Sequence, residues 1–362
     1  MFTFQNIYNA YLQCRRGKRN TINALKFEQN LIENLWDLTD ALQNRRYEIG
    51  ASICFLTTSP KLREVFAADF RDRIVHHILV GELEKIYEPR FISDVYNNRK
   101  NKGIHRAIKK TQSYMNSTYG GYYLQLDIKG FFYNLDKDIL YRYIYKECKE
   151  RDDILYLSHK IIYHDPTQDY VFKGDKTKLK LLPPHKTLFG LPANKGLPIG
   201  NLTSQFFANV YMNAFDNYIK RVLKVKYYIR YVDDFVLFSS SKERLEGLLV
   251  EIERYLNIHL SLTLRADTKL KHHKEGLDFL GYIIRPDYIL TRQRVVNNYK
   301  YKKAKYLQRY ENKQGKMSLS EIKAFLSVKA SFESHIKHSN SYNLNQKTGV
   351  INETNPFEYD RA

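Results

Sequence analysis

The chain has 362 residues, of which 59 are Lys or Arg and 39 are Asp or Glu, so its formal net charge is +20. With 43% hydrophobic and 27% charged residues, the composition is that of a globular protein and excludes a wholly disordered chain. The excess of positive charge is unusual for an enzyme of small metabolites and indicates a polyanionic partner, either nucleic acid or an acidic membrane.

Hydrophobic periodicity and turn residues predict the elements of the chain. Helices are expected over residues 21–48, 63–88, 107–115, 137–151, 202–221, 242–256 and 292–309. Strands are expected over residues 121–128 and 277–284, with a β-hairpin over 226–238. Residues 97–103 and 164–195 are predicted to be loops, and the polar chain from about Asn340 is predicted to be disordered.

Cysteine usage and hydropathy indicate the compartment. Cys14, Cys54 and Cys148 lie far apart, which favours neither a disulfide scaffold nor a zinc site and indicates a reducing cytosol. Residues 196–215 carry no formal charge, but they contain a proline and many polar side chains and are therefore not expected to span a membrane. The N-terminal residues lack the pattern of a secretion signal. We expect a cytoplasmic protein without a membrane partner.

Three aspartates form the main candidate for a catalytic site. Asp233 and Asp234 are adjacent at a predicted tight turn between apolar strands, where the simplest interpretation is a solvated hairpin tip. Asp127 ends another predicted strand. If the two strands are neighbours, Asp127 and Asp233 face each other, and like charges about 4 Å apart repel by about 4 kcal/mol at a dielectric of 20. Cations would have to neutralise them, and oxygen ligands suit Mg²⁺, of which a pair serves in-line nucleotidyl transfer.

Four segments in order resemble the palm motifs of a reverse transcriptase. They are LQLDIKGFF (124–132), GLPIGNLTSQFFANVYMN (196–213), YVDDFVLF (231–238) and LDFLGYII (277–284). Residues 63–108 resemble the fingers motifs of bacterial reverse transcriptases. The resemblance covers roughly residues 55–345. It implies an α+β right-hand fold of fingers, palm and thumb, with an antiparallel palm sheet and a helical thumb.

The second motif narrows the subfamily. Group II intron and retroviral enzymes usually carry Gln where this chain has Ile199, and the run LPIGNLTSQ (197–205), preceded by KTLF (186–189), is similar to the enzyme of a diversity-generating retroelement. Such elements copy a template RNA with errors at adenines and install the cDNA in a target gene. The lack of a recognisable DNA-binding and endonuclease tail also favours them over a mobile intron protein.

The resemblance implies partners and leaves alternatives. It implies template RNA, an RNA/DNA hybrid, dNTPs and a small basic accessory variability protein that forms a pentamer. The alternatives are a group II intron-like or defence-associated bacterial reverse transcriptase and, from another class, a catalytically silent RNA-binding protein on the same fold.

The matching motifs assign roles to residues. Asp127 and Asp233 match the acids that bind two Mg²⁺ ions, for which Mn²⁺ is an alternative, and Asp234 matches a third, weaker ligand. The carbonyl of Ile128 is expected to join them. Phe132 matches the aromatic steric gate that excludes a 2′-hydroxyl and so selects deoxynucleotides; its simpler interpretation is a core phenylalanine.

Nucleotide-binding residues are expected in the fingers and palm. Arg63 and Arg73 match basic positions that hold the triphosphate, since guanidinium groups bind phosphate in a bidentate manner; surface ion pairs are the alternative. The further candidates are Ile199, Gly200, Gln205 and Lys269. Lys269, or Lys271 beside it, matches a lysine that protonates the leaving pyrophosphate.

The basic helix after Pro286 is the candidate thumb. Residues 292–309 hold seven Lys or Arg and no acid, which exceeds what a solvated face requires and favours contact with the phosphates of a hybrid duplex. The candidate residues are Arg292, Arg294, Lys300, Lys302, Lys303 and Lys305.

The expected division of the chain has seven parts. They are an N-terminal helical segment (1–60), fingers (61–119), a first part of the palm (120–151), a fingers or insertion loop (152–195), a second part of the palm (196–288), a thumb (289–345) and a tail predicted to be disordered (346–362).

Overall fold

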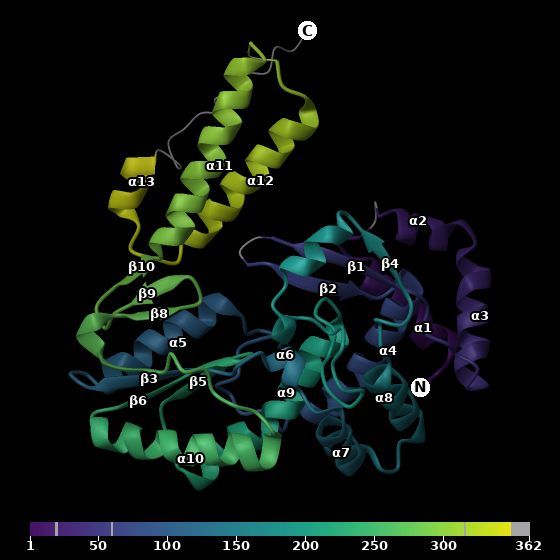
Figure 1. Cartoon of the computed structure of the whole chain (residues 1–362), viewed down its shortest axis with the longest axis horizontal. Coiled ribbons are helices and arrows are strands. Elements are labelled where there is room, and N and C mark those ends of the chain that lie inside the picture. Colours follow the sequence, from purple (N-terminus) through teal and green to yellow (C-terminus); the bar gives the residue numbers. More distant parts are fainter. Residues whose placement is uncertain (19–20, 59–60, 315, 349–362) are drawn as a thin grey trace. The chain divides into compact units, whose positions relative to one another are not determined.

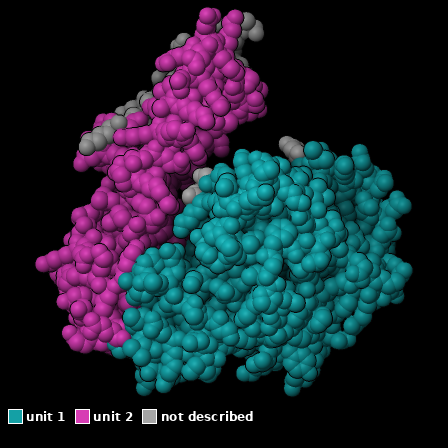
Figure 2. Space-filling view, viewed as in Figure 1, with its two compact units in different colours: residues 1–101, 125–235, 247–268 teal, residues 102–124, 236–246, 269–362 magenta. Residues whose placement is uncertain are grey.

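The computed structural model describes residues 1–18, 21–58, 61–314 and 316–348 as a mixture of helices and strands (Figure 1). The chain divides into two compact units, each built from separate stretches of sequence (Figure 2). The first contains residues 1–101, 125–235 and 247–268, and the second contains residues 102–124, 236–246 and 269 onward.

The first unit is rich in helices. They are α1 (Phe4–Arg15), α2 (Ile22–Gln29), α3 (Leu31–Gln43), α4 (Phe70–Tyr87), α6 (Phe131–Asn134), α7 (Lys137–Cys148), α8 (Asp152–Tyr163) and α9 (Leu202–Asn217). The helix expected over residues 21–48 is two helices, because Asn30 leaves helical geometry at φ −123°, ψ 50°. Helices α2, α3, α4, α7 and α9 lie in ranges that hydrophobic periodicity predicts to be helical, whereas α1, α6 and α8 lie outside those ranges. Helix α10 (Lys242–Leu260) contributes to both units.

The prediction that one helix covers residues 63–88 is wrong at its start. Residues Arg63–Ala67 form strand β2, which pairs antiparallel with β1 (Ser52–Thr57). The β-branched and aromatic side chains of this stretch suit a strand, and the helix begins only after Asp69, whose side chain accepts a hydrogen bond from Arg71 N. Strand β1 also shows that the segment 1–60 is not wholly helical.

The strands of the described residues form three sheets. Strands β2, β1 and β4 (Tyr170–Lys173) form one sheet, in which β4 runs parallel to β1 and interrupts the loop predicted over residues 164–195. A second sheet has the order β5-β6-β3-β7. Its strands are β3 (Tyr122–Asp127), β5 (Tyr228–Tyr231), β6 (Asp234–Ser239) and β7 (Lys269–His272). The predicted hairpin over 226–238 is confirmed as β5–β6.

The third sheet corrects a second prediction. Residues 277–284 are not one strand but an antiparallel hairpin of β8 (Leu277–Phe279) and β9 (Tyr282–Ile284), which β10 (Ile289–Thr291) extends. The turn falls at Leu280 and Gly281, whose φ values are 51° and 92°. Positive φ at both loop residues is the geometry of a two-residue hairpin turn.

The second unit continues into helices. They are α5 (Ile104–Ser117), α11 (Gln293–Asn312), α12 (Leu319–Ile336) and α13 (Tyr342–Thr348). Val296, Tyr299, Phe332 and Ile336 form a core between α11 and α12, and Leu344 of α13 packs against it. This packing overturns the predicted disorder for residues 342–348; residues 349–362 lie outside the described residues.

In the part of the chain that the structure describes, no helix combines the length and the apolar character needed to cross a bilayer. The uncharged run at 196–215 instead supplies a loop and most of α9, whose side chains are largely buried.

Candidate active site

Asp127 and Asp233 lie at the ends of neighbouring strands, as the sequence predicts. Asp127 is the last residue of β3, Asp233 directly precedes β6, and these strands are adjacent in their sheet. The amide of Ile128 donates to the carbonyl of Asp233 at 3.3 Å. Burial, and then the negative charge of Asp127, raise the pKa of Asp233 to about 6. The two carboxylates are therefore close enough to repel each other.

Asp234 reaches the same face of β3 through a side-chain hydrogen bond. Gln125 Nε2 donates to Asp234 Oδ1 at 3.3 Å. Because side chains two residues apart share a face of a strand, Gln125 and Asp127 lie on one face of β3. The three predicted acids are thus gathered from two adjacent strands.

The donor set matches hard cations. Among the described residues, no group of three His, Cys, Asp or Glu side chains is arranged to hold a metal ion. The observation that favours a cation is the pair of repelling carboxylates on Asp127 and Asp233, whose repulsion a divalent ion would relieve. Carboxylate and carbonyl oxygens are the ligands that Mg²⁺ prefers, so the residues present fit such an ion.

Arg265 adds a positive charge that sequence reasoning missed. Its amide donates to the carbonyl of Asp127 at 2.9 Å, and its Nη1 lies 3.5 Å from Asp127 Oδ2. The same guanidinium binds Asp267 through Nε at 2.9 Å and Nη2 at 3.1 Å. A single arginine between Leu264 and Ala266 gives no sequence signal of this role, because its partner is 138 residues away.

A loop before α9 packs on strand β2. The amide of Phe66 donates to the carbonyl of Ile199 at 3.0 Å, and the amide of Ala68 donates to Asn201 Oδ1 at 3.0 Å. Gly200 has a φ of 123°, and a Cβ atom there would lie 2.7 Å from a Val65 side-chain carbon. Only glycine fits this position, which explains the close approach of the loop to the strand.

Ile199 itself is half-buried. Its side chain packs against the hydrophobic cluster formed by Cys54, Phe66, Tyr133 and Leu188. This packing is the simpler of the two roles expected for Ile199, and its proposed effect on fidelity stays a prediction.

Phe132 differs from its neighbour in exposure. Phe131 is buried at 2% exposure, whereas Phe132 is half-buried, and the two rings meet edge to face at 5.3 Å. The carbonyl of Phe132 accepts a hydrogen bond from Leu197 N at 2.8 Å, which links α6 to the loop before α9. Of the two rings, Phe132 is the one accessible to a ligand.

The two candidate arginines have different surroundings. Arg63 is exposed at the start of β2, and its charge lowers the pKa of Asp233, against the larger effects that raise it. Arg73 is half-buried in α4, and its Nε donates to the carbonyl of Ala68 at 2.7 Å. In the described ranges neither arginine forms an ion pair. The acid beside Arg63, Glu64, is buried and accepts from Thr187 Oγ1 at 2.6 Å.

The remaining nucleotide candidates are solvent-accessible. Gln205 is exposed in the first turn of α9, one residue after a buried serine. Lys269 is exposed at the start of β7 in the second unit. Lys271, the alternative, forms an ion pair with Glu275 at 2.7 Å.

The basic helix α11 carries most of the predicted nucleic-acid contacts. Arg292 precedes the helix and pairs with Asp278. The exposed candidates are Arg294, Lys300 and Lys305. The half-buried ones are Lys302 and Lys303.

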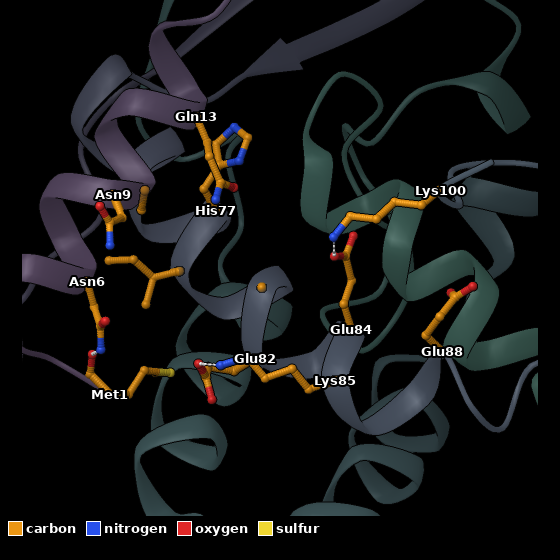
Figure 3. Close-up of a pocket in the computed structure, with 13 residues that line it drawn as sticks. Met1, Asn6, Asn9, Gln13, His77, Glu82, Glu84, Lys85, Glu88 and Lys100 are labelled. Atoms are coloured by element: carbon orange, nitrogen blue, oxygen red, sulfur yellow. Dashed lines mark hydrogen bonds and ion pairs between the residues drawn. The ribbon is translucent and has the colours of Figure 1, made fainter. Parts of the chain in front are cut away.

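A groove of about 410 Å³ between α1 and α4 contains none of the predicted residues (Figure 3). Two ion pairs lie along it: Glu84 pairs with Lys100 at 3.5 Å, and Glu82 pairs with Lys85 at 2.5 Å. The groove is separate from the aspartates.

Comparison with known proteins identifies relatives. Residues 58–284 match the protein family described as reverse transcriptase (RNA-dependent DNA polymerase). Protein YkfC of Escherichia coli K12 is 24% identical over 323 residues, covering 78% of this chain and 80% of YkfC. The group II intron-encoded protein LtrA of Lactococcus lactis is 23% identical over 292 residues, covering 63% of this chain and 45% of LtrA. The chain thus spans less than half of LtrA.

Among solved structures, telomerase from Candida albicans in complex with a fragment of telomeric RNA aligns with 84% of this chain and 55% of its own. The TM-score is 0.45 and the sequence identity is 12%.

Proposed function

The chain belongs to the reverse transcriptase family of RNA-directed DNA polymerases, and we propose that it copies an RNA template into DNA at the site formed by Asp127, Asp233 and Asp234. The observation that carries this proposal is the pairing of Asp127 and Asp233 on adjacent strands, joined by the hydrogen bond from Ile128 to Asp233. Both acids lie within residues 58–284, the part of the chain that matches the family, and this coincidence supports the proposal that they form the reacting centre.

Divalent ions complete the proposed site. Asp127, Asp233 and the carbonyl of Ile128 would hold two Mg²⁺ ions, with Mn²⁺ as the alternative and Asp234 as the weaker ligand. Such ions supply Lewis acidity and neutralise charge that develops on the transferring phosphoryl group. The carboxylates of this chain orient the ions, and the half-buried position of Asp233 keeps its charge from being screened by water.

The incoming dNTP is proposed to lie against the loop before α9. Phe132 would pack beneath the sugar and exclude a 2′-hydroxyl, and Arg63 would hold the triphosphate, consistent with its exposure and its unpaired guanidinium among the described residues. Arg73 is proposed as a second triphosphate contact, although its Nε already binds Ala68 O. Gly200, which lets this loop approach strand β2 closely, is also proposed as a nucleotide contact. The further proposed contacts are Ile199, Gln205 and Lys269.

Helix α11 is proposed to bind the backbone of the RNA/DNA hybrid. Its exposed cations and the +20 charge of the chain support contact with phosphates rather than with base edges. In this proposal residues 61–119 form the fingers, residues 120–151 and 196–288 form the palm, and residues 289–345 form the thumb.

A primer-extension assay tests the proposed function. With an RNA template, a DNA primer, dNTPs and Mg²⁺, the chain should extend the primer, and chelation of Mg²⁺ should stop extension. Asp127→Asn and Asp233→Asn should each lower the rate by about a thousandfold or more, because each removes a charge that stabilises the transition state by several kcal/mol. Asp175→Asn is the matched control, because Asp175 is an exposed acid that caps a short turn and pairs with Lys178 at 3.9 Å. Near-normal extension by either variant would contradict the assignment.

We further propose that the enzyme makes error-prone cDNA for a diversity-generating retroelement in a bacterial or phage-infected cytoplasm. The run LPIGNLTSQ with Ile199 supports this subtype over an intron enzyme. A basic pentameric accessory protein would be its partner. A near-identical pair of template and variable repeats beside the gene, and cDNA errors concentrated opposite template adenines, would support the proposal; uniformly low errors would remove it.

A further inference from the structure

The turn that carries Asp233 contains a residue in an unfavourable conformation. Strands β5 and β6 are joined by the two residues Val232 and Asp233, and φ is +61° at Val232 but not positive at Asp233. A positive φ at only the first loop residue is the pattern of a type II′ turn, which normally has glycine there. A β-branched residue with positive φ is strained, so something in the surrounding structure must hold it.

Both peptide groups of Val232 are held by buried side chains. Its amide donates to Asn97 Oδ1 at 3.0 Å, and its carbonyl accepts from Arg230 Nη1 at 2.8 Å. Arg230 is 0% exposed and Asn97 is 3% exposed. Because neither bond belongs to the ladder between the two strands, the turn is fixed by the protein interior and not by the hairpin alone.

A second layer fixes the two side chains that hold Val232. Arg230 donates hydrogen bonds to the carboxylate of Asp216 from Nε at 2.8 Å and from Nη2 at 2.6 Å. Its Nη1 is then available to donate to the carbonyl of Val232. Asn97 Nδ2 donates to Asn209 Oδ1 at 2.9 Å, and Asn209 Nδ2 donates to the carbonyl of Asn97 at 3.0 Å. This reciprocal pair leaves only the oxygen of the Asn97 amide to face Val232.

We propose that Asn97, Asn209, Asp216 and Arg230, which we call the turn clamp, form a positioning device that holds Val232 at positive φ and thereby aims Asp233. The proposal rests on the proposed function, because it assigns Asp233 to the polymerase centre. All four residues lie in the first unit and come from a loop, from α9 and from β5. If Val232 relaxed to negative φ, the following peptide would rotate and carry the Asp233 carboxylate away from Asp127.

The clamp hypothesis predicts an unusual rescue. Asn97→Ala removes the bond to Val232 N, so the strained turn relaxes and Asp233 loses its position. Glycine adopts positive φ at no steric cost, so Val232→Gly in the same chain should make the bond from Asn97 dispensable. A residue that only supports the fold would not be rescued in this way, because a second substitution would add its own loss.

The experiment measures Mn²⁺ binding by electron paramagnetic resonance of the free ion, together with kcat and KM for dNTP. Asn97→Ala should weaken Mn²⁺ binding and lower kcat by about tenfold or more with little change in KM, and Asn97→Ala/Val232→Gly should return both to within about threefold of the parent chain. Thr39→Val is the matched control, since it also removes one buried hydrogen bond, from Thr39 Oγ1 to Leu35 O at 2.7 Å, and should alter neither quantity.

The results for the double variant and for Asn97→Ala test the turn clamp directly. Additive losses in the double variant, or an Asn97→Ala chain that behaves like Thr39→Val, would overturn it. Should Asn97→Ala fail to fold, Asn209→Ala loosens the same amide and must show the same rescue by Val232→Gly. Mn²⁺ binding requires no turnover, so a parent chain that binds Mn²⁺ with this pattern but does not extend a primer would overturn the proposed function and leave the turn clamp standing.

Discussion

The guanidinium of Arg265 lies against the carboxylate of Asp127, with Nη1 3.5 Å from Oδ2. Both side chains are about 40% exposed, at 42% for Arg265 and 40% for Asp127, so water and salt screen the pair. The backbone bond from Arg265 N to Asp127 O keeps the arginine beside the acid even when its side chain moves. A resident cation therefore stands where we propose that Asp127 binds a metal ion.

Removing this cation should strengthen metal binding. Arg265→Gln should tighten Mn²⁺ binding about two- to fivefold, which corresponds to the ~0.5–1 kcal/mol of a partly exposed ion pair that the metal no longer has to displace. Titration followed by electron paramagnetic resonance checks the value. Arg254→Gln, which breaks the surface pair with Glu251, is the matched control and should leave binding unchanged. Weaker binding in Arg265→Gln would mean that the arginine supports the metal site.

The aspartates could be predicted from sequence, whereas their supports could not. Apolar strands flanking Asp127 and Asp233 give a local signal, and the order of the motifs supplies the pairing. Asn97 lies in a stretch predicted to be a polar loop, yet it is only 3% exposed. Its partner Val232 is 135 residues away, so no local sequence pattern indicates this contact. Such contacts depend on tertiary packing, which hydrophobic periodicity does not predict.

The errors in secondary structure have the same origin. Residues 63–67 precede a strong helix and carry Glu and Ala, so periodicity extends the helix over them, but pairing with β1 makes them a strand. The sequence of residues 277–284 predicts one strand and not a hairpin because a single Gly is a weak turn signal, and the residue type of Leu280 does not indicate its positive φ.

Phe132 should govern the choice of sugar. Phe132→Val should raise incorporation of ribonucleotides relative to deoxynucleotides by about 10- to 100-fold, because a smaller side chain leaves space for the 2′-hydroxyl. Single-turnover incorporation of rNTP and dNTP measures the ratio. Phe131→Leu perturbs the adjacent buried ring and should lower stability without changing the ratio. A ratio that changes only in the Phe131 variant would transfer the gate to that residue.

Helix α11 should account for part of the salt dependence of RNA binding. Each phosphate contact to a single strand contributes about −0.7 to the slope of log K against log salt, so replacing Lys300, Lys302, Lys303 and Lys305 by Gln should flatten the slope by up to about 3. The matched control replaces four exposed lysines outside α11, namely Lys26, Lys146, Lys149 and Lys224. Equal slopes for both quadruple variants would show that net charge, and not this helix, sets the dependence.

His76 should make the fold sensitive to acid. It is 4% exposed, and burial lowers its pKa to about 3, with smaller contributions from His77, Arg73 and His164. In the unfolded chain its pKa returns to about 6.5, so as pH falls from 6.5 toward 3 the unfolded state binds the proton first and stability is lost. The slope is about 1.4 kcal/mol per pH unit, and it is absent above pH 6.5.

Urea unfolding at pH 7.5 and pH 5 measures this effect. His76→Leu should lose about 2 kcal/mol less stability between the two pH values than the parent chain. Burial and the charge of Lys18 lower the pKa of His77 to about 4, so some acid sensitivity should remain. His159→Gln, which alters an exposed histidine, should retain the full sensitivity. An unchanged loss in His76→Leu would refute the assignment to His76.

Ile199 offers the sharpest test of the proposed subtype. An amide at this position would hydrogen-bond near the incoming nucleotide, whereas a branched alkyl group cannot, so one constraint on nucleotide placement is missing. A contact worth about 1.4 kcal/mol changes discrimination tenfold, so Ile199→Gln should lower misincorporation opposite template adenines by about that factor while synthesis continues. Sequencing of cDNA copied from one adenine-rich template by both enzymes measures the change.

Because Ile199 packs against Phe66 and its neighbours, the Ile199→Gln change also costs stability. Ile199→Val separates the two effects, since it removes packing without adding an amide and should leave the adenine errors unchanged. Equal error frequencies in all three enzymes would reduce Ile199 to a packing residue of the loop before α9.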